Sequence, residues 1–351
     1  MGCDLSSLLD PSSTSLEALS NKKLAIDGNN ILYQFLSSIR QPDGSLLMDS
    51  KGNITAHLSG LFYRTIKWLE NGILPIFIFD GKPPSLKESV LLERQERKEI
   101  AKEKFTQAIE EGDLSAAFSF AQQTSKLTPQ MIEQAKELLQ AMGVPYLQAP
   151  SEGEAQAAYL VKQNLAWAVA SQDYDSLLFG AQRLIRNLSF SGKRKVPKKN
   201  MYVSVDPEII ELDKELNKLG ISYQQLIWIA ILIGTDFNPG VYKVGPKTAF
   251  KIVKNSKSFD EAKDLLIAKF SERKEEIIEA LKNYKEIEEF FISPPIEKAF
   301  NIEFREPDNQ KIISILVDKY EFSLERVEKS LSELSAIKKE KKSQSKLDSF
   351  F

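Results

Sequence analysis

The sequence predicts an α/β fold in which a central, mostly parallel sheet is flanked by helices. Two short apolar segments, residues 22–27 and the Ile- and Phe-rich residues 73–80, have the length and composition of buried strands. Between them, residues 54–70 carry apolar side chains at helical spacing, and Gly72 ends that helix. A strand, a helix and a second strand in this order predict a parallel sheet.

Helices and strands continue to alternate along the rest of the chain. Pro129 starts an amphipathic helix that Gly143 closes, and residues 151–155 open the next helix. Residues 222–234 are apolar at helical period, and the pattern is mainly helical from there to about residue 335. Shorter strands are predicted at residues 144–147, 165–170, 184–189 and 201–205, and near residues 300–304.

Residues 85–125 differ from the rest because charges alternate densely and apolar residues are sparse. This composition predicts a helix with little buried face that projects from the body of the fold. Residues 336–343 are also highly charged, and we expect them to form a linker.

Composition narrows the class of protein. With 351 residues, 42% of them hydrophobic, the chain can bury the core of one large domain or two small ones. The sequence has no run of about 18 apolar residues, so it predicts no membrane span. Residues 1–10 lack the basic cluster of a secretory signal. The single cysteine, Cys3, excludes an internal disulfide and disfavours structural zinc, and the single histidine, His57, excludes chemistry that needs several. A reducing intracellular compartment fits these features.

The net charge of −2 argues against nucleic acid as a partner, because proteins that bind it usually carry a basic excess. This average hides two basic runs. They comprise Lys193, Arg194, Lys195, Lys198 and Lys199 in one segment and Lys338, Lys339, Lys341 and Lys342 in the other. Acidic residues elsewhere offset these runs, and the positions of the acids are the more informative feature.

Acidic residues follow the apolar strands. Asp27 and Asp80 each end one strand, and the pair Asp173 and Asp175 follows the strand at residues 165–170. Taken singly, each has an ordinary explanation as a turn residue.

Three more acids flank helices and also have ordinary explanations. Glu152 and Glu154 lie where a helix opens, and Ser151 followed by Glu154 has the pattern of a capping box. Asp236 follows an apolar helix, where it would serve as a turn or cap residue.

Taken together, the acids predict a metal site. Ligands of open parallel sheets bind at the carboxyl ends of the strands, and carboxylates that converge there cannot all ionise without a compensating cation. Because the set contains no Cys or His, its oxygen ligands select magnesium or manganese over zinc. Two such ions can clamp a phosphodiester and activate the attacking water. This chemistry predicts phosphodiester hydrolysis.

Basic residues follow Asp80 closely. Lys87 and Arg94 are seven residues apart and so share a helical face, which Arg97 and Lys98 extend into a cationic surface. The ordinary alternative is a solvated charged helix. Beside a metal site, the same surface would hold a scissile phosphate and its developing charge.

Residues 240–249 form a turn punctuated by Gly240 and Gly245 that enters a helix containing Lys247. Backbone N–H groups at such a turn, and at a helix N-terminus, bind phosphate without reading base sequence. A plain corner between two helices is the alternative.

The last eight residues, 344–351, follow the charged linker, and we do not expect them to enter the core. This segment resembles the peptide that binds sliding clamps, because it has Gln344, Leu347 three residues on, and then Phe350 and Phe351. Two exposed terminal aromatics need a partner pocket. A sliding clamp is therefore the expected partner of this tail.

Nearly the whole chain resembles the flap endonucleases, the replication and repair nucleases that cut 5′ flaps. The segments that carry the resemblance are residues 25–28, 33–35, 62–66, 79–84, 144–146, 149–155, 173–175 and 233–236. The resemblance implies structure-specific hydrolysis at the base of 5′ flaps by two-metal-ion catalysis, with 5′–3′ exonuclease activity, in Okazaki fragment maturation and in repair.

The resemblance also implies roles for individual residues. Two magnesium ions, for which manganese can substitute, would be held by Asp27, Asp80, Glu152, Glu154, Asp173, Asp175 and Asp236. Lys87 and Arg94 would contact the scissile phosphate, and Gly2 would lie by the active site. DNA would be bound by Tyr33, which stacks on a base near the cut, and by Arg97, Lys98, Gly240, Gly245 and Lys247. A potassium ion is implied at the turn of residues 240–249.

The resemblance implies one nuclease domain over residues 1–335, which is a monomer by itself. Its expected parts are an N-terminal part at about 1–126 with a helical arch at about 82–126, an internal part at about 127–256 with a helix–turn–helix at about 225–256, and a helical part at 257–335. A flexible linker and the clamp-binding peptide would follow at residues 336–351.

Three features depart from the usual family pattern. Residues 3–6 match the usual start of the family only loosely. Lys243 stands where the family commonly has glycine, which puts the potassium site in question. The chain stops at Phe351 without the long basic tail of many nuclear homologues, which favours an archaeal-type enzyme of the prokaryotic cytoplasm or nucleoid, the nucleus being the expected location in a eukaryote. The alternatives are a related 5′ exonuclease or junction nuclease, a clamp-tethered DNA-binding scaffold without catalysis, and a magnesium-dependent phosphatase.

Overall fold

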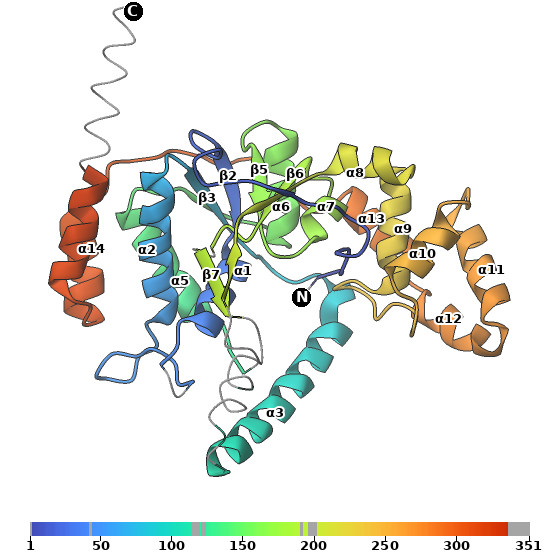
Figure 1. Cartoon of the computed structure of the whole chain (residues 1–351), viewed down its shortest axis with the longest axis horizontal. Coiled ribbons are helices and arrows are strands. Elements are labelled where there is room, and N and C mark those ends of the chain that lie inside the picture. Colours follow the sequence, from blue (N-terminus) through green and yellow to red (C-terminus); the bar gives the residue numbers. More distant parts are fainter. Residues whose placement is uncertain are drawn as a thin grey trace, which may run out of the picture.

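The computed structural model describes residues 2–41, 44–111, 124–189, 192–195 and 202–335, together with residues 113 and 120. A seven-stranded mixed sheet lies at the centre, in the order β1-β9-β6-β5-β2-β3-β4 (Figure 1). The strands are β1 (Ser12–Ser13), β2 (Lys23–Asp27), β3 (Leu74–Phe79), β4 (Tyr146–Gln148), β5 (Ala168–Ala170), β6 (Arg183–Arg186) and β9 (Glu208–Glu211). The five strands from β6 to β4 are parallel, and β9 and β1 join one edge antiparallel. The predicted α/β fold with a mostly parallel sheet is confirmed.

Helices account for most of the remaining described residues. In the first half of the chain they are α1 (Gly28–Ser38), α2 (Ala56–Glu70), the 3-10 turn η1 (Ser85–Lys87), α3 (Glu88–Glu110), α5 (Pro129–Ala141), α6 (Gly153–Lys162) and α7 (Asp175–Leu178). In the second half they are α8 (Leu212–Leu219), α9 (Tyr223–Ile233), α10 (Pro246–Val253), α11 (Phe259–Lys269), η2 (Ser271–Arg273), α12 (Lys274–Ala280), α13 (Tyr284–Ile292), α14 (Asn309–Ile313) and the π-helical η3 (Ser314–Lys319). Residues 324–335 are also helical.

The sheet is buried on both faces, which explains why its central strands read as continuous apolar runs. Along β2, Leu24 and Ile26 face one hydrophobic cluster, whereas Ala25 faces the other. The first cluster contains residues of α1, α2 and α5, and the second contains residues of α6, α7 and α9. The helical layers therefore hold the strand ends in place from both sides.

Helix α3 extends away from the sheet (Figure 1). This placement agrees with the prediction of a projecting helix over residues 85–125, whose sparse apolar residues offer little to bury. The part of that segment between residues 112 and 123 lies largely outside the described residues.

The predicted strand near residues 300–304 is wrong. Residues 294–308 have no regular secondary structure. Phe300, Ile302 and Phe304 are partly buried against the core cluster that contains α6 and α9. The backbone N–H of Arg305 donates to the carbonyl of Gly143 at 2.9 Å. The alternating apolar residues are thus satisfied by packing on the body, without a place in the sheet.

Two other expectations are corrected. The capping box at Ser151 is absent, because the N-cap of α6 is Glu152 and no side chain caps it. Part of the basic run expected to separate two strands is itself a strand, β7 (Gly192–Lys195), which pairs antiparallel with β8 (Tyr202–Val205). No single helix in the described part of the chain is long and apolar enough to cross a membrane, although the bent pair α8 and α9, at 83°, passes by combined length and composition.

Candidate metal centre

Four of the acids lie at one edge of the sheet. Asp27 is the last residue of β2, and Asp80 directly follows β3. Asp173 and Asp175 follow β5, with Asp175 as the first residue of α7. Because β5, β2 and β3 are adjacent and parallel, their carboxyl ends meet and bring these residues together.

Helix α6 brings two more acids to the same edge. Glu152 is its N-cap, and Glu154 lies in its first turn. The backbone N–H of Gly153 donates to Oδ1 of Asp80 at 2.7 Å. A Cβ atom at Gly153 would lie 2.8 Å from the same oxygen, so a larger residue there would displace the Asp80 carboxylate. The seventh acid, Asp236, follows α9 and is buried.

Backbone and hydroxyl donors hold the carboxylates in place. Oδ1 of Asp27 accepts from the backbone N–H of Asn30 at 2.9 Å, and Oδ2 accepts from the Ser171 hydroxyl at 3.0 Å. Oδ1 of Asp175 accepts from the N–H of Cys3 at 2.7 Å. A Cβ atom at Gly2 would collide with the Asp175 carboxylate. The N-terminus therefore lies against the site, where the sequence placed Gly2.

Burial and mutual repulsion raise the pKa of several of these carboxylates. Burial raises the pKa of Asp27 to about 8, and the charge of Asp80 adds to the shift. Burial raises the pKa of Asp175 to about 8 as well, with Asp236 as the next cause. Burial also raises the pKa of Glu154 and of Asp80. Since the ionised forms repel one another, a bound cation would stabilise the whole set.

The residues present fit divalent metal. Every side chain in the set is a hard oxygen donor, and Oε1 of Glu154 is buried without a hydrogen-bond partner among the described residues. In the described part of the chain, no three acidic, Cys or His side chains already enclose one ion position. The ligand set is therefore gathered at the strand ends but not closed around an ion.

Lys87 lies within this cluster. Its Nζ is 2.7 Å from Oε2 of Glu152 and 3.2 Å from Oδ2 of Asp236. Burial alone would lower the pKa of Lys87, but these two carboxylates outweigh burial and raise it. The ammonium group therefore acts as the counter-ion of two predicted ligands.

The prediction that Lys87 and Arg94 share one helical face is corrected, because Lys87 ends η1 and only Arg94 belongs to α3. Helix α3 follows η1 without a break, but the side chains of Arg94, Arg97 and Lys98 lie outside the described part. Tyr33 lies on α1 with 38% of its surface exposed, so its ring is accessible for stacking.

Residues 234–245 connect α9 to α10, so the predicted turn of residues 240–249 comprises the end of this connection and the start of α10. A Cβ atom at Gly240, which has φ of 69°, would collide with the backbone of Ile233, so glycine is required there. Gly245 is the N-cap of α10 and faces open space, and Lys247 lies in the first turn. Lys243 has φ of 60°, a left-handed conformation that glycine adopts without strain.

Three polar residues of the site were missed by the sequence reasoning: Asn30, Gln34 and Ser171. Asn30 follows Asp27 by three residues, which is the spacing of an N-cap and its N–H donor. That pattern was present in the sequence. No local signal indicated that Ser171 donates to Asp27, because the two residues meet only through the sheet.

Comparison with known proteins matches both halves of the site. Residues 3–101 match the family model of the XPG N-terminal domain, and residues 143–236 match that of the XPG I-region. The first range contains Asp27 and Asp80, and the second contains the other five acids. Fold and site together define a nuclease of the XPG class.

Full-length relatives narrow the class. Flap endonuclease 1 of Staphylothermus marinus is 53% identical over 91% of this chain and 89% of its own length. The solved structure of flap endonuclease-1 from Methanococcus jannaschii has a TM-score of 0.74 and 42% identity, covering 97% of this chain and 100% of that one. The catalytic core of Rad2 in complex with DNA substrate has a TM-score of 0.67 and 25% identity over 93% of this chain and 96% of that one.

The chain belongs to the flap endonuclease family. It is accordingly a metal-dependent nuclease that hydrolyses phosphodiester bonds of DNA, and the alternatives of a non-catalytic scaffold and a small-molecule phosphatase are set aside. The residues predicted to bind a sliding clamp, Gln344, Leu347, Phe350 and Phe351, lie outside the described residues.

Proposed function

We propose that this nuclease hydrolyses the phosphodiester at the base of a 5′ flap with two magnesium ions bound among its buried carboxylates. The ligands are Asp27, Asp80, Glu152, Glu154, Asp173, Asp175 and Asp236. The observation that carries this proposal is the gathering of carboxylates at the ends of adjacent parallel strands, where burial and mutual charge raise the pKa of Asp27 and Asp175. When bound, the metal ions supply a hydroxide nucleophile and charge stabilisation for the leaving oxygen.

Within this proposal, Lys87 changes partners during the reaction. Here its ammonium group donates to Glu152 at 2.7 Å. With DNA in the site, it turns toward an oxygen of the scissile phosphate and stabilises the charge that develops there. Arg94 has the same role from α3. Lys87 is the better placed of the two to contact the scissile phosphate, because it already lies among the carboxylates.

Substrate structure is selected by surfaces on either side of the site. The projecting helix α3 forms the arch around the free 5′ strand, with Arg97 and Lys98 on its phosphates. The turn of residues 240–249 binds duplex DNA through its N–H groups and Lys247. The same turn binds a potassium ion. Tyr33 stacks on a base next to the cut.

The C-terminal peptide is the tether to a sliding clamp. The clamp is bound by Gln344, Leu347, Phe350 and Phe351. The charged linker lets the nuclease, which is a monomer by itself, reach DNA while the peptide is bound. The enzyme works in the intracellular compartment that holds DNA, in replication and repair, and also trims 5′ ends as an exonuclease.

The decisive experiment is cleavage of an end-labelled 5′-flap substrate with magnesium and with EDTA. A nicked duplex and a four-way junction are tested beside it. We expect magnesium-dependent cleavage at the base of the flap, with much slower cleavage of the junction. Faster cleavage of the junction, or cleavage in EDTA, would overturn the proposed function.

A further inference from the structure

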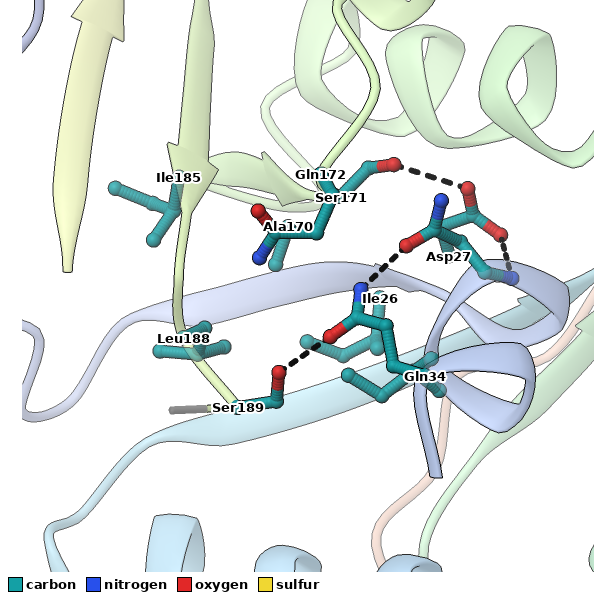
Figure 2. A pocket seen from close by; sticks show the side chains of 11 residues that line it. Ile26, Asp27, Gln34, Ala170, Ser171, Gln172, Ile185, Leu188 and Ser189 are labelled. Carbon is teal, nitrogen blue, oxygen red and sulfur yellow. Dashed lines mark hydrogen bonds between the residues drawn. The ribbon is translucent and has the colours of Figure 1, made fainter. Parts of the chain in front are cut away.

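A chain of polar side chains runs from the end of the β6 segment into the metal centre. The Ser189 hydroxyl donates to Oε1 of Gln34 at 2.5 Å, and Nε2 of Gln34 donates to Oδ1 of Asn30 at 2.6 Å. Nδ2 of Asn30 then donates to Oδ2 of Asp173 at 2.9 Å. Figure 2 shows Gln34 between Ser189 and the part of the site that holds Asp27. We call these three residues, Ser189, Gln34 and Asn30, the amide relay.

The hydrogen bonds of the amide relay can point in only one direction. A carboxylate that binds metal is deprotonated and only accepts hydrogen bonds. Asn30 must therefore turn its NH₂ group toward Asp173, which leaves Oδ1 facing Gln34. Gln34 must in turn donate its own NH₂ group, which leaves Oε1 to accept from Ser189. The orientation of each amide is thus set by its neighbour.

Asn30 joins two candidate ligands on different strands. Its backbone N–H donates to Asp27, at the end of β2, while its side chain donates to Asp173, after β5. Gln34 lies one turn further along α1, on the same helical face. Asn30 therefore holds the carboxylates of Asp27 and Asp173 close together.

The surroundings leave the relay little freedom. A cavity of about 10 Å³ lies beside Asn30 and Gln34, which is space for roughly one water molecule. Its apolar wall is formed by Ile26, Ile31, Ala170, Ile185 and Leu188 (Figure 2). An amide that left the relay would meet these side chains and lose its hydrogen bonds.

We propose that Gln34 and Asn30 are positioning residues that set the metal affinity of the site by holding Asp173 beside Asp27. This inference rests on the proposed function, because it takes both aspartates as metal ligands. Hydrogen-bond partners of metal ligands typically change affinity by about 10–100-fold when they are removed. Gln34 touches no ligand itself and acts through Asn30.

The test uses a substitution for which the amide relay and simple electrostatics predict opposite changes in Mn²⁺ affinity. Gln34→Glu keeps the size of the side chain but removes its donor, so Asn30 would turn its NH₂ group to Glu and its oxygen to Asp173. The variant should bind Mn²⁺ roughly tenfold more weakly than the parent. Simple electrostatics predicts the opposite, because an added carboxylate attracts the cation.

Gln172→Glu is the matched control. Gln172 lines the same cavity, is half-buried like Gln34, and has no part in the relay. This variant adds the same charge beside the same site, and it should leave Mn²⁺ binding unchanged or tighten it. Gln34→Met adds no charge and cannot hydrogen-bond, so it is the second relay variant. It should weaken binding several-fold.

Isothermal titration of Mn²⁺ into each protein without DNA gives the affinity, and thermal melting in EDTA checks that each variant folds. Cleavage at rising Mn²⁺ is the second measurement, and saturating Mn²⁺ should restore the rate of Gln34→Met. Parental affinity in folded Gln34→Met, or parental or tighter affinity in folded Gln34→Glu, overturns the amide relay. If Asp173→Asn also binds Mn²⁺ like the parent, the ligand assignment fails, and the relay fails with it.

Discussion

Nζ of Lys87 lies 2.7 Å from Oε2 of Glu152. A basic residue directly before the projecting helix α3 therefore neutralises an acid at the start of α6. Both side chains are largely buried, with 12% and 9% of their surfaces exposed. The pair must break for Lys87 to reach a phosphate, and a cation bound among the carboxylates would compete with Lys87 for Glu152. Its strength therefore depends on whether cation is present among the carboxylates.

Replacing Lys87 by Met should slow the chemical step on the order of 100-fold, because a charge that stabilises the transition state is lost. In EDTA the variant should also be less stable by on the order of 2 kcal/mol, since Glu152 loses its charged partner. Magnesium should shrink this difference. Single-turnover cleavage and thermal melting in both conditions measure the two effects. Lys102→Met on exposed α3 is the control, and equal melting of the Lys87 variant and the parent in EDTA contradicts the pairing.

Asp175→Asn should abolish cleavage while DNA binding in calcium remains. The substitution keeps the shape of the side chain but removes one ligand charge from the buried cluster. The turn of residues 240–249, which is predicted to bind the duplex, contains none of the predicted metal ligands, so we expect DNA binding to persist. A turnover assay beside a binding titration separates the two functions, with the exposed Asp213→Asn as control. Turnover close to that of the parent would remove Asp175 from the ligand set.

Lys243→Gly should increase the free energy of unfolding by up to about 1 kcal/mol. Lys243 has φ of 60°, and a left-handed backbone costs a residue with a Cβ atom about 1–2 kcal/mol. Glycine removes this cost, but it also makes the unfolded chain more flexible, and this offsets part of the gain. Lys243→Val should act in the opposite direction, because a β-branched residue tolerates this conformation poorly. Urea denaturation of the three proteins measures the order. A glycine variant less stable than the parent contradicts the strain.

His57 should make the fold less stable in acid. The ring is fully buried on α2 and bonded to Gln134 at 2.9 Å, and burial lowers its pKa to about 4. The ordinary pKa of histidine is near 6.5, so the unfolded chain binds more protons between pH 4 and 6.5. Stability from this residue is complete above pH 6.5 and is lost as pH falls toward 4, by up to about 3 kcal/mol.

Urea denaturation of the parent and of His57→Gln from pH 7 to 4.5 isolates this contribution. The parent should lose its advantage over the variant as the pH falls, because the variant has no group that titrates at this position. A difference that stays constant over the range means that the ring is protonated in the folded state as readily as in the unfolded chain.

Deleting residues 344–351 should leave cleavage of free oligonucleotides unchanged and remove stimulation by the sliding clamp. Phe350 and Phe351 are the predicted apolar anchors of the peptide, and burial of two rings with Leu347 would support roughly micromolar binding. The double substitution Phe350→Ala with Phe351→Ala should reproduce the deletion. Calorimetry against purified clamp measures the affinity, and a double variant that binds like the parent excludes this tail as the tether.

The sequence by itself determined the class of fold, because apolar spacing and Gly or Pro punctuation depend on neighbouring residues. Strands β2 and β3 and helices α2, α5 and α9 lie within a few residues of their predicted positions. The acids could be found for the same reason. A residue that ends a parallel strand reaches the same sheet edge whatever the rest of the chain does.

Only the tertiary structure decided which polar groups meet. The antiparallel pairing of β1 with β9, the bonds of Lys87 to Glu152 and Asp236, and the amide relay all join segments far apart in the chain. Lys87 was predicted to face phosphate from a helix, and Gln34 was not singled out as part of the site. Hydrophobic periodicity carries no information about such partners, because a hydrogen bond depends on where two chain segments lie after the core has packed, and that is set by contacts over the whole sheet.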